Sequence, residues 1–128
     1  MKESILIHPL SDSNSVRDES FFTGHAFSAS SPETADEVRQ VILCCAAHGI
    51  TITPHGGLTG INGAGTATNN HSMNLQHLTG VSYRAKDNTL WALAGTTFSD
   101  IETSVRTEST IYTQLTASPT ETSDTIGR

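Results

Sequence analysis

The residues with the clearest chemical potential are the glycines of a short run that begins at Thr53 and ends at Gly65. Five of the ten glycines in the chain fall within residues 56–65. The run follows the alternating apolar stretch Ile50–Thr53, which favours a strand. A glycine-rich loop after a strand exposes backbone N–H groups, because no Cβ atom stands in front of them. Such a loop can cradle a phosphate or diphosphate, although the same composition also forms plain turns.

The spacing of these glycines excludes two familiar nucleotide-binding loops. A Walker loop needs a lysine after its last glycine, and the only lysines are Lys2 and Lys86. A Rossmann fingerprint needs a third glycine and a helix that begins in the loop, but Gly63-Ala64-Gly65 is followed by the polar segment 66–72. A nucleotide held by this loop would therefore need another architecture.

Composition limits the classes of protein to which the chain can belong. Its 128 residues allow one domain with a modest core, and its hydrophobic and charged fractions suit a soluble globular protein. The formal net charge of −6 and the lack of a basic patch in the sequence argue against nucleic acid as the main partner. No apolar run approaches the roughly 20 residues of a membrane span. The apolar stretch within residues 1–10 is too short for a signal peptide, so we expect a cytoplasmic protein.

The cysteines and histidines do not form a pattern that predicts a metal site. Cys44 and Cys45 are adjacent on a predicted helix, where neighbouring side chains point about 100° apart, so we interpret both as small packing residues rather than a disulfide. The six histidines lack the spacing of paired ligands. His48 and His71 are interpreted as surface or loop residues, and Trp91 as a core residue.

The clearest predicted element is a helix over residues 34–48. Thr34 and Glu37 have the spacing of a capping box at its start, and Gly49 is placed to end it. Strands predicted at 27–31 and 50–54 flank this helix. The apolar stripe that would face the core consists of Val38, Val41, Ile42, Cys45 and Ala46.

A strand, a helix and a strand in this order predict a βαβ unit with parallel strands and a right-handed crossover. A third short strand is expected at 72–75. In open α/β sheets, ligands lie beyond the carboxyl ends of the strands, and the glycine run begins at such an end. The topology therefore strengthens the hypothesis of a phosphate site.

The rest of the chain predicts less regular structure. An antiparallel hairpin is expected over 81–93, and a second helix from about residue 97, which Thr97 and Asp100 would start. This helix would carry Phe98, Ile101 and Val105 inward. Residues 1–20 are interpreted as a loose arm with one short helix, 111–115 as a strand and 118–127 as a loop. The predicted class is α/β, or α+β overall, with a short parallel sheet followed by the hairpin and helix.

Several short motifs occur in a specific order, although none is decisive alone. They are Asp18-Glu19-Ser20, Gly24-His25-Ala26, Pro32 with Thr34–Val38, Ile50–Gly60, Asn74-Leu75 with Leu78, Ala94–Thr97, and Pro119–Gly127. In this order the chain resembles the N-terminal part of the FAD-binding domain of FAD-linked oxidases, the group of vanillyl-alcohol oxidase and p-cresol methylhydroxylase (the PCMH type). Within that group it is most similar to the glycolate oxidase and D-lactate dehydrogenase branch. The resemblance covers roughly residues 18–128.

The resemblance implies an incomplete PCMH-type fold, with an arm at 1–20 and an incomplete FAD-binding domain at 21–128. The first α/β subdomain would span about 21–80, and a second would begin at about 81–128. It also implies FAD as cofactor and a small 2-hydroxy acid as the substrate of a longer parent enzyme. No catalytic residue can be named, and the chain alone is expected to be inactive. The residues implied to contact FAD are His55, Gly56, Gly57, Leu58, Thr59, Gly60, Asn62, Gly63, Ala64, Pro119, Ser123, Thr125, Ile126 and Gly127.

Three departures from the family pattern bear on the loop. His55 stands where the family has arginine, which weakens the electrostatic hold on a diphosphate. Leu58 stands where the family has glycine, and its Cβ strains the loop if the backbone there has positive φ. In the branch that links FAD covalently through a histidine in this loop, that histidine is at the place of Thr59. We therefore expect non-covalent FAD.

Three functional interpretations stay open at this point. The chain is part of a flavin-dependent oxidoreductase, or a non-catalytic remnant or binding module of the same fold with little FAD affinity. A third interpretation is another flavin reductase, resembling those that act on cell-wall precursors. An incomplete domain would leave apolar surface exposed around Val81, Trp91 and 111–115, so we expect self-association. The alternative is that the C-terminal segment folds back over the open edge.

Overall fold

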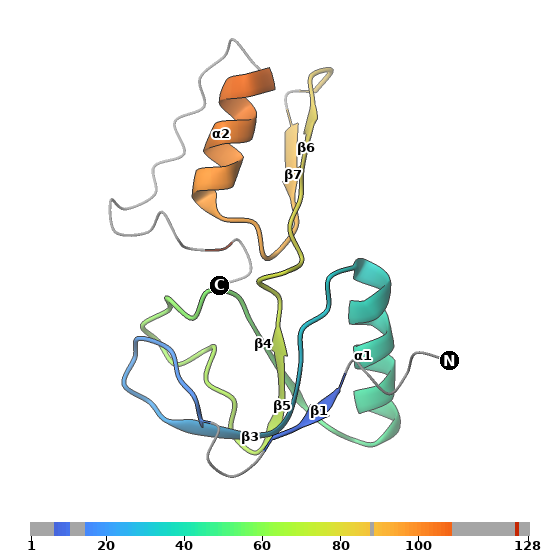
Figure 1. Ribbon diagram of the computed structural model, residues 1–128, viewed down its shortest axis with the longest axis vertical. Coiled ribbons are helices and arrows are strands. Elements are labelled where there is room, and N and C mark those ends of the chain that lie inside the picture. Colours follow the sequence, from blue (N-terminus) through green and yellow to red (C-terminus); the bar gives the residue numbers. More distant parts are fainter. Residues whose placement is uncertain (1–6, 11–14, 88, 109–124, 126–128) are drawn as a thin grey trace.

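The protein has a mixed α/β fold, as the sequence predicts (Figure 1). The structure is a computed structural model that describes residues 7–10, 15–87, 89–108 and 125. One group of elements is a sheet with a helix beside it, and the other is a hairpin with a second helix. In chain order the elements are β1 (His8–Pro9), β2 (Ser15–Val16), β3 (Gly24–Ser30), α1 (Ala35–Ala47), β4 (Ile52–His55), β5 (Asn70–Asn74), β6 (Val81–Arg84), β7 (Thr89–Ala92) and α2 (Phe98–Glu108).

The sheet is built around β5. Its strand order is β1-β3-β5-β4, with β2 also paired to β3. Both β3 and β4 run parallel to β5, whereas β1 and β2 are antiparallel to β3. The predicted parallel arrangement of three strands is therefore confirmed, with β5 inserted between the two strands that flank α1.

Helix α1 begins and ends as its sequence predicts. The Thr34 hydroxyl accepts a hydrogen bond from the N–H of Glu37 at 3.2 Å. The Glu37 carboxylate accepts from the N–H of Glu33 rather than from that of Thr34. Gly49 has φ +66°, and the N–H of Ile50 donates to the carbonyl of Cys45 at 2.9 Å. A residue with positive φ can end the helix in this way with least strain when it is glycine.

The apolar face of α1 is narrower than the sequence predicts. Val41 and Cys45 are each 1% exposed and pack with Met73 of β5, whereas Ile42 is 45% exposed. Cys44 is also exposed, so only one of the two cysteines is a packing residue. Ile42 and Cys44 therefore lie beside the strip of α1 that contacts the sheet.

The interpretation of His71 as a surface or loop residue is wrong. His71 lies on β5 and is fully buried, with its Nδ1 2.8 Å from the Ser28 hydroxyl and its Nε2 2.8 Å from the Ser30 hydroxyl. It is in register with Ser28 on β3 and with Ile52 on β4. The residues around His71 are polar and do not look like a central strand. The histidine can be buried there because two serine hydroxyls form hydrogen bonds with its imidazole in place of water.

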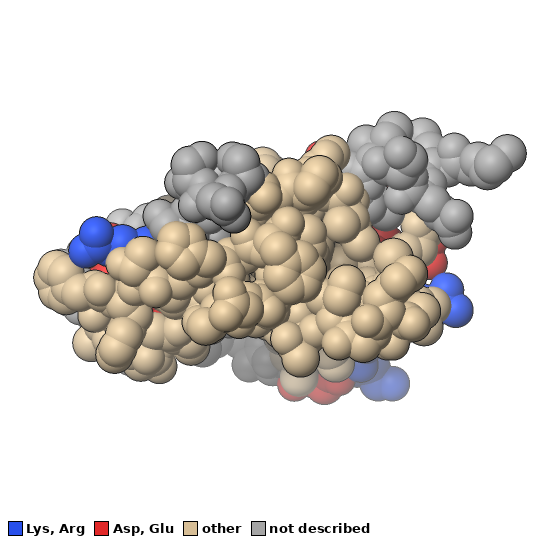
Figure 2. All heavy atoms as spheres, turned by 90° about the horizontal axis from the view of Figure 1, so that it is seen from below, with Lys and Arg blue, Asp and Glu red and all other residues tan. Residues whose placement is uncertain are grey.

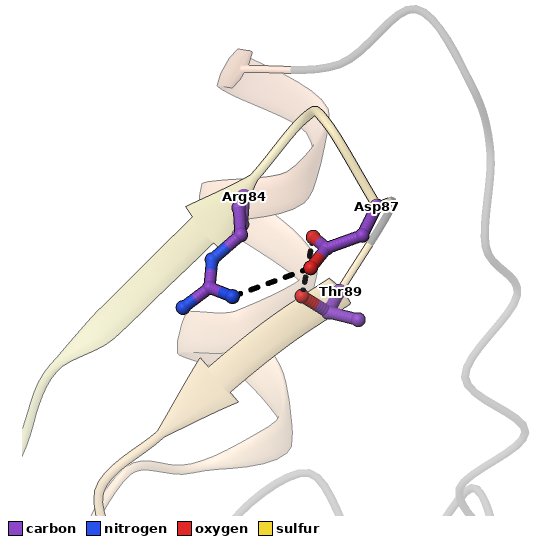
Figure 3. Close-up of polar contacts among 3 residues, drawn as sticks. All are labelled: Arg84, Asp87 and Thr89. Carbon is purple, nitrogen blue, oxygen red and sulfur yellow. Dashed lines mark hydrogen bonds and ion pairs between the residues drawn. The ribbon is translucent and has the colours of Figure 1, made fainter.

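The predicted hairpin and second helix are confirmed. Strands β6 and β7 are antiparallel, and Asp87 bridges their turn by accepting hydrogen bonds from Arg84 at 3.3 Å and Thr89 at 2.8 Å (Figure 3). Helix α2 is capped by Thr97, whose hydroxyl accepts from the N–H of Asp100 at 3.1 Å. Its inward side chains include the buried Ile101 and Val105.

The interpretation of Trp91 as a core residue is wrong, because Trp91 is 67% exposed on β7. Trp91 is in register with the exposed Ser82, on the opposite face of the hairpin from Leu90 and Ala92, whose side chains are half-buried. The indole therefore lies on a part of the hairpin that no described element covers.

The segment interpreted as a loose N-terminal arm contributes strands where it is described. Both β1 and β2 pair with β3, and no helix occurs in the described part of residues 1–20. The predicted strand at 111–115 and most of the predicted loop at 118–127 lie outside the described residues. Neither described helix, with 13 and 11 residues, is long and apolar enough to span a membrane.

The two buried histidines predict that the protein loses stability in mild acid. Burial lowers the pKa of His71 and of His55 below the ordinary value of 6.5, although the Gly56 carbonyl partly offsets this at His55. As pH falls below 6.5, the unfolded chain binds more protons than the folded chain, so the free energy of unfolding decreases. We expect a slope of up to about 1.4 kcal/mol per pH unit for each histidine, measured by urea unfolding at several pH values.

The variant His71→Gln should flatten this slope, because it removes one of the two titrating groups. The exposed His77→Gln serves as the matched control and should leave the slope unchanged. A slope that is equal in the wild type and His71→Gln would contradict the assignment.

Candidate cofactor-binding site

The glycine-rich loop, residues 56–65, leaves the carboxyl end of β4 and borders a pocket of about 310 Å³. Five residues predicted to contact the cofactor line this pocket, and three further lining residues were not predicted. The predicted ones are His55, Leu58, Gly60, Asn62 and Ala64. The others are Asp18, Ile61 and Gly65.

Much of the loop backbone is free to bind a ligand. The N–H groups of residues 58–63 donate no hydrogen bond to another described residue. Further along, the N–H of Ala64 donates to the Asn62 side chain at 3.1 Å. Asn62 therefore stabilises the loop through its oxygen, while its amide nitrogen stays a candidate donor. A run of unpaired N–H groups is a suitable environment for an anion.

Leu58 has the left-handed conformation that the sequence predicts to be a source of strain. Its φ is +57°, in a region that residues with a Cβ rarely adopt. A Cβ on Gly65 would lie 2.9 Å from the Leu58 Cδ2 atom, so the leucine side chain packs directly over Gly65. This packing within the loop offsets part of the strain, which is typically about 1–3 kcal/mol.

His55 is held within the protein at the base of the loop. It is 6% exposed, its Nε2 lies 3.0 Å from the Ser72 hydroxyl, and its Nδ1 lies 3.1 Å from the Gly56 carbonyl. Because a carbonyl can only accept, Nδ1 carries the proton and Nε2 accepts from Ser72. This neutral tautomer agrees with the lowered pKa of His55, for which burial is the main cause.

The structure brings one residue of the predicted C-terminal contact segment to the loop. Thr125 is 4% exposed, and its hydroxyl accepts a hydrogen bond from the N–H of Gly57 at 3.2 Å. Thr125 also forms an isolated antiparallel bridge with Thr97, just before α2. The other predicted contacts of this segment lie outside the described residues: Pro119, Ser123, Ile126 and Gly127.

Close contact between β3 and the end of the crossover depends on Gly24. A Cβ on Gly24 would lie 1.9 Å from the carbonyl oxygen of Ala67, which is closer than any side-chain atom tolerates. The motif Gly24-His25-Ala26 thus has a packing role beside the loop.

Asp18 is the charged residue of the pocket lining, and the sequence reasoning did not place it in the site. It is 5% exposed, and its Oδ1 atom accepts hydrogen bonds from the N–H and the hydroxyl of Ser20. The Ser20 hydroxyl lowers the pKa of Asp18 most, and burial acts in the opposite direction. The Asp-x-Ser spacing at 18–20 was a signal for a polar turn, but it carried no information about the distant loop.

The electrostatics of the site come from the backbone rather than from cationic side chains. Among the residues that the structure describes, no Lys or Arg lines the pocket. Figure 2 shows charged side chains near the edges of the molecule and a broad central area without them. Among the described residues, no group of three or more His, Cys, Asp or Glu side chains is placed to hold a metal ion.

Comparisons with known proteins identify the class of this domain. The sequence profile of the FAD binding domain family matches residues 29–124. A search of curated proteins found no match. The chain therefore belongs to the FAD binding domain family, which is found in flavin-dependent oxidoreductases.

Solved structures share this fold at low sequence identity. BBE-like 28 from Arabidopsis thaliana matches with a TM-score of 0.66 and 21% identity, over 80% of this chain and 24% of that chain. Xylooligosaccharide oxidase from Myceliophthora thermophila C1, solved with xylobiose, matches with a TM-score of 0.62 and 17% identity, over 78% and 23%. A berberine bridge enzyme variant, described as a reticuline dehydrogenase, matches with a TM-score of 0.61 and 20% identity, over 70% and 18%.

The present chain thus spans about a quarter of the length of these structures or less. The resemblance to FAD-linked oxidases is supported at the level of fold and family. The glycolate and lactate branch stays a prediction, as do the individual cofactor contacts.

The contact between Thr125 and Gly57 predicts a measurable effect on the loop. Thr125→Val keeps nearly the same shape but removes the hydroxyl, so the Gly57 N–H loses its acceptor. We expect about fivefold to tenfold faster hydrogen exchange at the Gly57 amide, the effect of one net hydrogen bond. Thr125→Ser keeps a hydroxyl and should retain most of the protection. Unchanged exchange in Thr125→Val would contradict this contact.

Proposed function

We propose that this chain is the diphosphate-binding portion of an FAD-dependent oxidoreductase, and that the glycine-rich loop holds the FAD diphosphate. The observation that carries the proposal is the run of unpaired N–H groups at residues 58–63, which borders the pocket at the carboxyl end of β4. Membership of the FAD binding domain family makes FAD the ligand that this arrangement fits best.

The residues of the loop suit a diphosphate bound through the backbone. Gly56, Gly57, Gly60 and Gly63 have no side chain to keep a diphosphate from the loop backbone, although the Gly57 N–H itself donates to Thr125. The buried Thr59 hydroxyl has no hydrogen-bond partner among the described residues, so it is a candidate additional donor. When bound, FAD supplies the capacity to accept a hydride, while the protein binds and orients it.

Non-covalent attachment is proposed for this loop. A covalent bond to flavin requires a nucleophilic side chain such as histidine or cysteine. The histidine at the base of the loop, His55, is buried and has both ring nitrogens in hydrogen bonds to Ser72 and Gly56. The two cysteines lie on α1. These positions support FAD held by hydrogen bonds and packing.

The C-terminal residues are proposed to form the flavin side of the same site. The sequence resemblance assigns Pro119, Ser123, Thr125, Ile126 and Gly127 to this side. The hydrogen bond between Thr125 and Gly57 supports this arrangement, because it brings one of these residues to the loop. We also propose a domain division at about 21–80 and 81–128, with an arm at 1–20. The separate sheet and hairpin groups in Figure 1 support the boundary near residue 80, whereas β1 and β2 pair with β3 of the first subdomain.

The reaction of the whole protein is proposed to be oxidation of a small 2-hydroxy acid, resembling glycolate or lactate. This finer proposal rests on the ordered sequence motifs alone. Xylooligosaccharide oxidase and the reticuline dehydrogenase are named for other substrates. Because the chain spans about a quarter of those structures or less, the substrate pocket is proposed to lie outside it.

A second candidate function is a binding module of the same fold with little FAD affinity. Two observations favour it: the Thr125 hydroxyl occupies the Gly57 N–H, and the charged residue of the pocket lining is the acidic Asp18. FAD titration of the chain separates the two candidates. The oxidoreductase interpretation predicts weak binding by this chain and tight binding by a longer parent, whereas the module interpretation predicts weak or no binding by both.

A bulky residue at Gly57 should impair FAD retention in the parent protein. Gly57→Val places a branched side chain where the diphosphate would approach, so the purified parent should lose most of its flavin absorbance near ~450 nm. Ser82→Val introduces the same side chain at an exposed position of β6 and is the matched control. Equal flavin content in Gly57→Val and the wild type would remove the loop from the site.

Self-association is proposed for the chain as it stands. Large apolar side chains are exposed, among them Trp91 at 67% and Leu93 at 43% beside the hairpin. Light scattering at several concentrations should give an average mass above that of the monomer, and Trp91→Thr should reduce it. Leu43→Gln removes an exposed apolar side chain of α1 and should have less effect. A strictly monomeric wild type at all concentrations would contradict this prediction and favour a fold that closes on itself.

A further inference from the structure

The segment 17–22, called the bracing turn here, lies against the glycine-rich loop at several points. The N–H of Glu19 donates to the carbonyl of Gly60 at 3.0 Å. The Phe22 ring packs on Gly63, where an added Cβ would lie 3.0 Å from the ring. A Cβ on Gly65 would lie 3.9 Å from the Asp18 Cβ atom. The turn therefore contacts the loop over much of its length.

The bracing turn holds a conformation that it would not adopt alone. Phe21 has φ +68°, although its side chain is 83% exposed. A bulky residue in the left-handed region is strained, and such strain persists only where surrounding contacts impose it. The contacts of Phe21 itself are modest: the Arg17 guanidinium lies 5.7 Å from its ring centre. The constraint must therefore come from its neighbours in the turn.

The carboxylate of Asp18 is the centre of these contacts. One oxygen, Oδ1, accepts from the N–H of Ser20 at 3.0 Å and from its hydroxyl, and that hydroxyl also accepts from the N–H of Phe22 at 3.3 Å. The other oxygen, Oδ2, is buried and has no hydrogen-bond partner of good geometry among the described residues.

The unpaired oxygen of Asp18 lies beside the loop, since a Cβ on Gly60 would be 4.0 Å from Oδ2. The Gly65 N–H and the Thr66 hydroxyl both lower the pKa of Asp18, so they lie near the carboxylate without completing a hydrogen bond. The Thr66 hydroxyl is itself buried and unpaired among the described residues. An ionised buried oxygen needs donors, and the Gly65 N–H and the Thr66 hydroxyl are two donors beside this carboxylate.

We propose that Asp18 is a positioning residue for the glycine-rich loop: its buried carboxylate joins the bracing turn to Gly65 and Thr66 and so fixes the loop before a ligand binds. The expected benefit to FAD binding rests on the proposed function, whereas the effect of Asp18 on the loop does not. Asp18 acts through the loop and not by touching the diphosphate, because two anionic groups in direct contact would repel each other.

This arrangement explains why an acidic side chain is present at an anion site. Anchoring one end of the loop from below leaves the N–H groups of residues 58–63 unpaired and available. Fixing the loop in advance lowers the entropy that a ligand must overcome to order it. An asparagine would replace one acceptor oxygen with a donor group, which faces either the N–H of Ser20 or the donors of the loop.

The test is amide hydrogen exchange of the chain without ligand, comparing Asp18→Asn with the wild type. We expect about tenfold faster exchange in Asp18→Asn at the amides of Ala64, Thr66 and Glu19, which donate hydrogen bonds within the loop or to it, and unchanged exchange in α1. Asp87→Asn makes the same chemical change at the exposed hairpin turn and should leave the loop unaffected. Equal loop protection in Asp18→Asn and the wild type would overturn the proposal, as would an equal loss in Asp87→Asn.

A pH profile adds a readout that a merely structural role would not move. The pKa of Asp18 is lowered in the folded protein from its ordinary value of 3.8. The stabilisation by the Asp18 carboxylate is therefore fully present above pH 3.8 and is lost as pH falls through the pKa of the folded state. After correction for the intrinsic exchange rate, loop protection in the wild type should fall in this acid range. A parallel fall in Asp18→Asn would contradict the assignment to Asp18.

If Asp18→Asn fails to fold, Ser20→Ala provides the second variant, since it removes only the hydroxyl that holds Oδ1. Loop exchange should then rise severalfold while α1 stays protected, and unchanged loop exchange would overturn the proposal. FAD titration separates this inference from the proposed function. Faster loop exchange in the variants together with no FAD binding by the wild type or the parent would support the brace and refute the cofactor.

Discussion

The parallel pairing of β4 with β5 is the constraint on which the rest of the site depends. Parallel neighbours cannot be joined by a tight turn, because the chain must return from the carboxyl end of one strand to the amino end of the next. A helix usually makes this crossover, but here residues 56–69 make it without one. The glycine-rich loop is the first part of this crossover. The N–H groups of residues 58–63 donate to no described residue, because no described helix or strand takes them up.

One face of the sheet forms the hydrophobic core with α1, and the other face positions the start of the loop. On one face, α1 packs Val41 and Cys45 against Met73, and His71 is satisfied by serine hydroxyls. In parallel strands, residues in register share a face, so the pair Thr53 and Ser72 projects from the other side. There Ser72 holds His55 at the start of the loop. A central strand buried on both faces thus fixes the origin of the loop.

The elements with local signals could be predicted from the sequence. The Thr34 cap, the Gly49 end, the parallel strands and the hairpin all follow from residue type and short spacing, whereas the strain at Leu58 was expected from the family resemblance, which has glycine there. The residues that were misjudged depend on distant partners. His71 is buried because Ser28 and Ser30 reach it from 43 and 41 residues away, and Trp91 is exposed because it lies on the hairpin face opposite the half-buried Leu90 and Ala92. Asp18 was missed in the site because its contact with Gly65 and Thr66 is equally non-local.

The central claim is that the loop N–H groups bind a diphosphate, and a titration followed by NMR tests it most directly. FAD, ADP and riboflavin would be added separately, at up to millimolar concentration, to the isotopically labelled chain, and its backbone amide shifts recorded. FAD and ADP share the diphosphate, which riboflavin lacks, so both should shift the amides of residues 58–63 while riboflavin leaves them in place. Shifts caused equally by riboflavin, or amide shifts that avoid the loop altogether, would contradict the account.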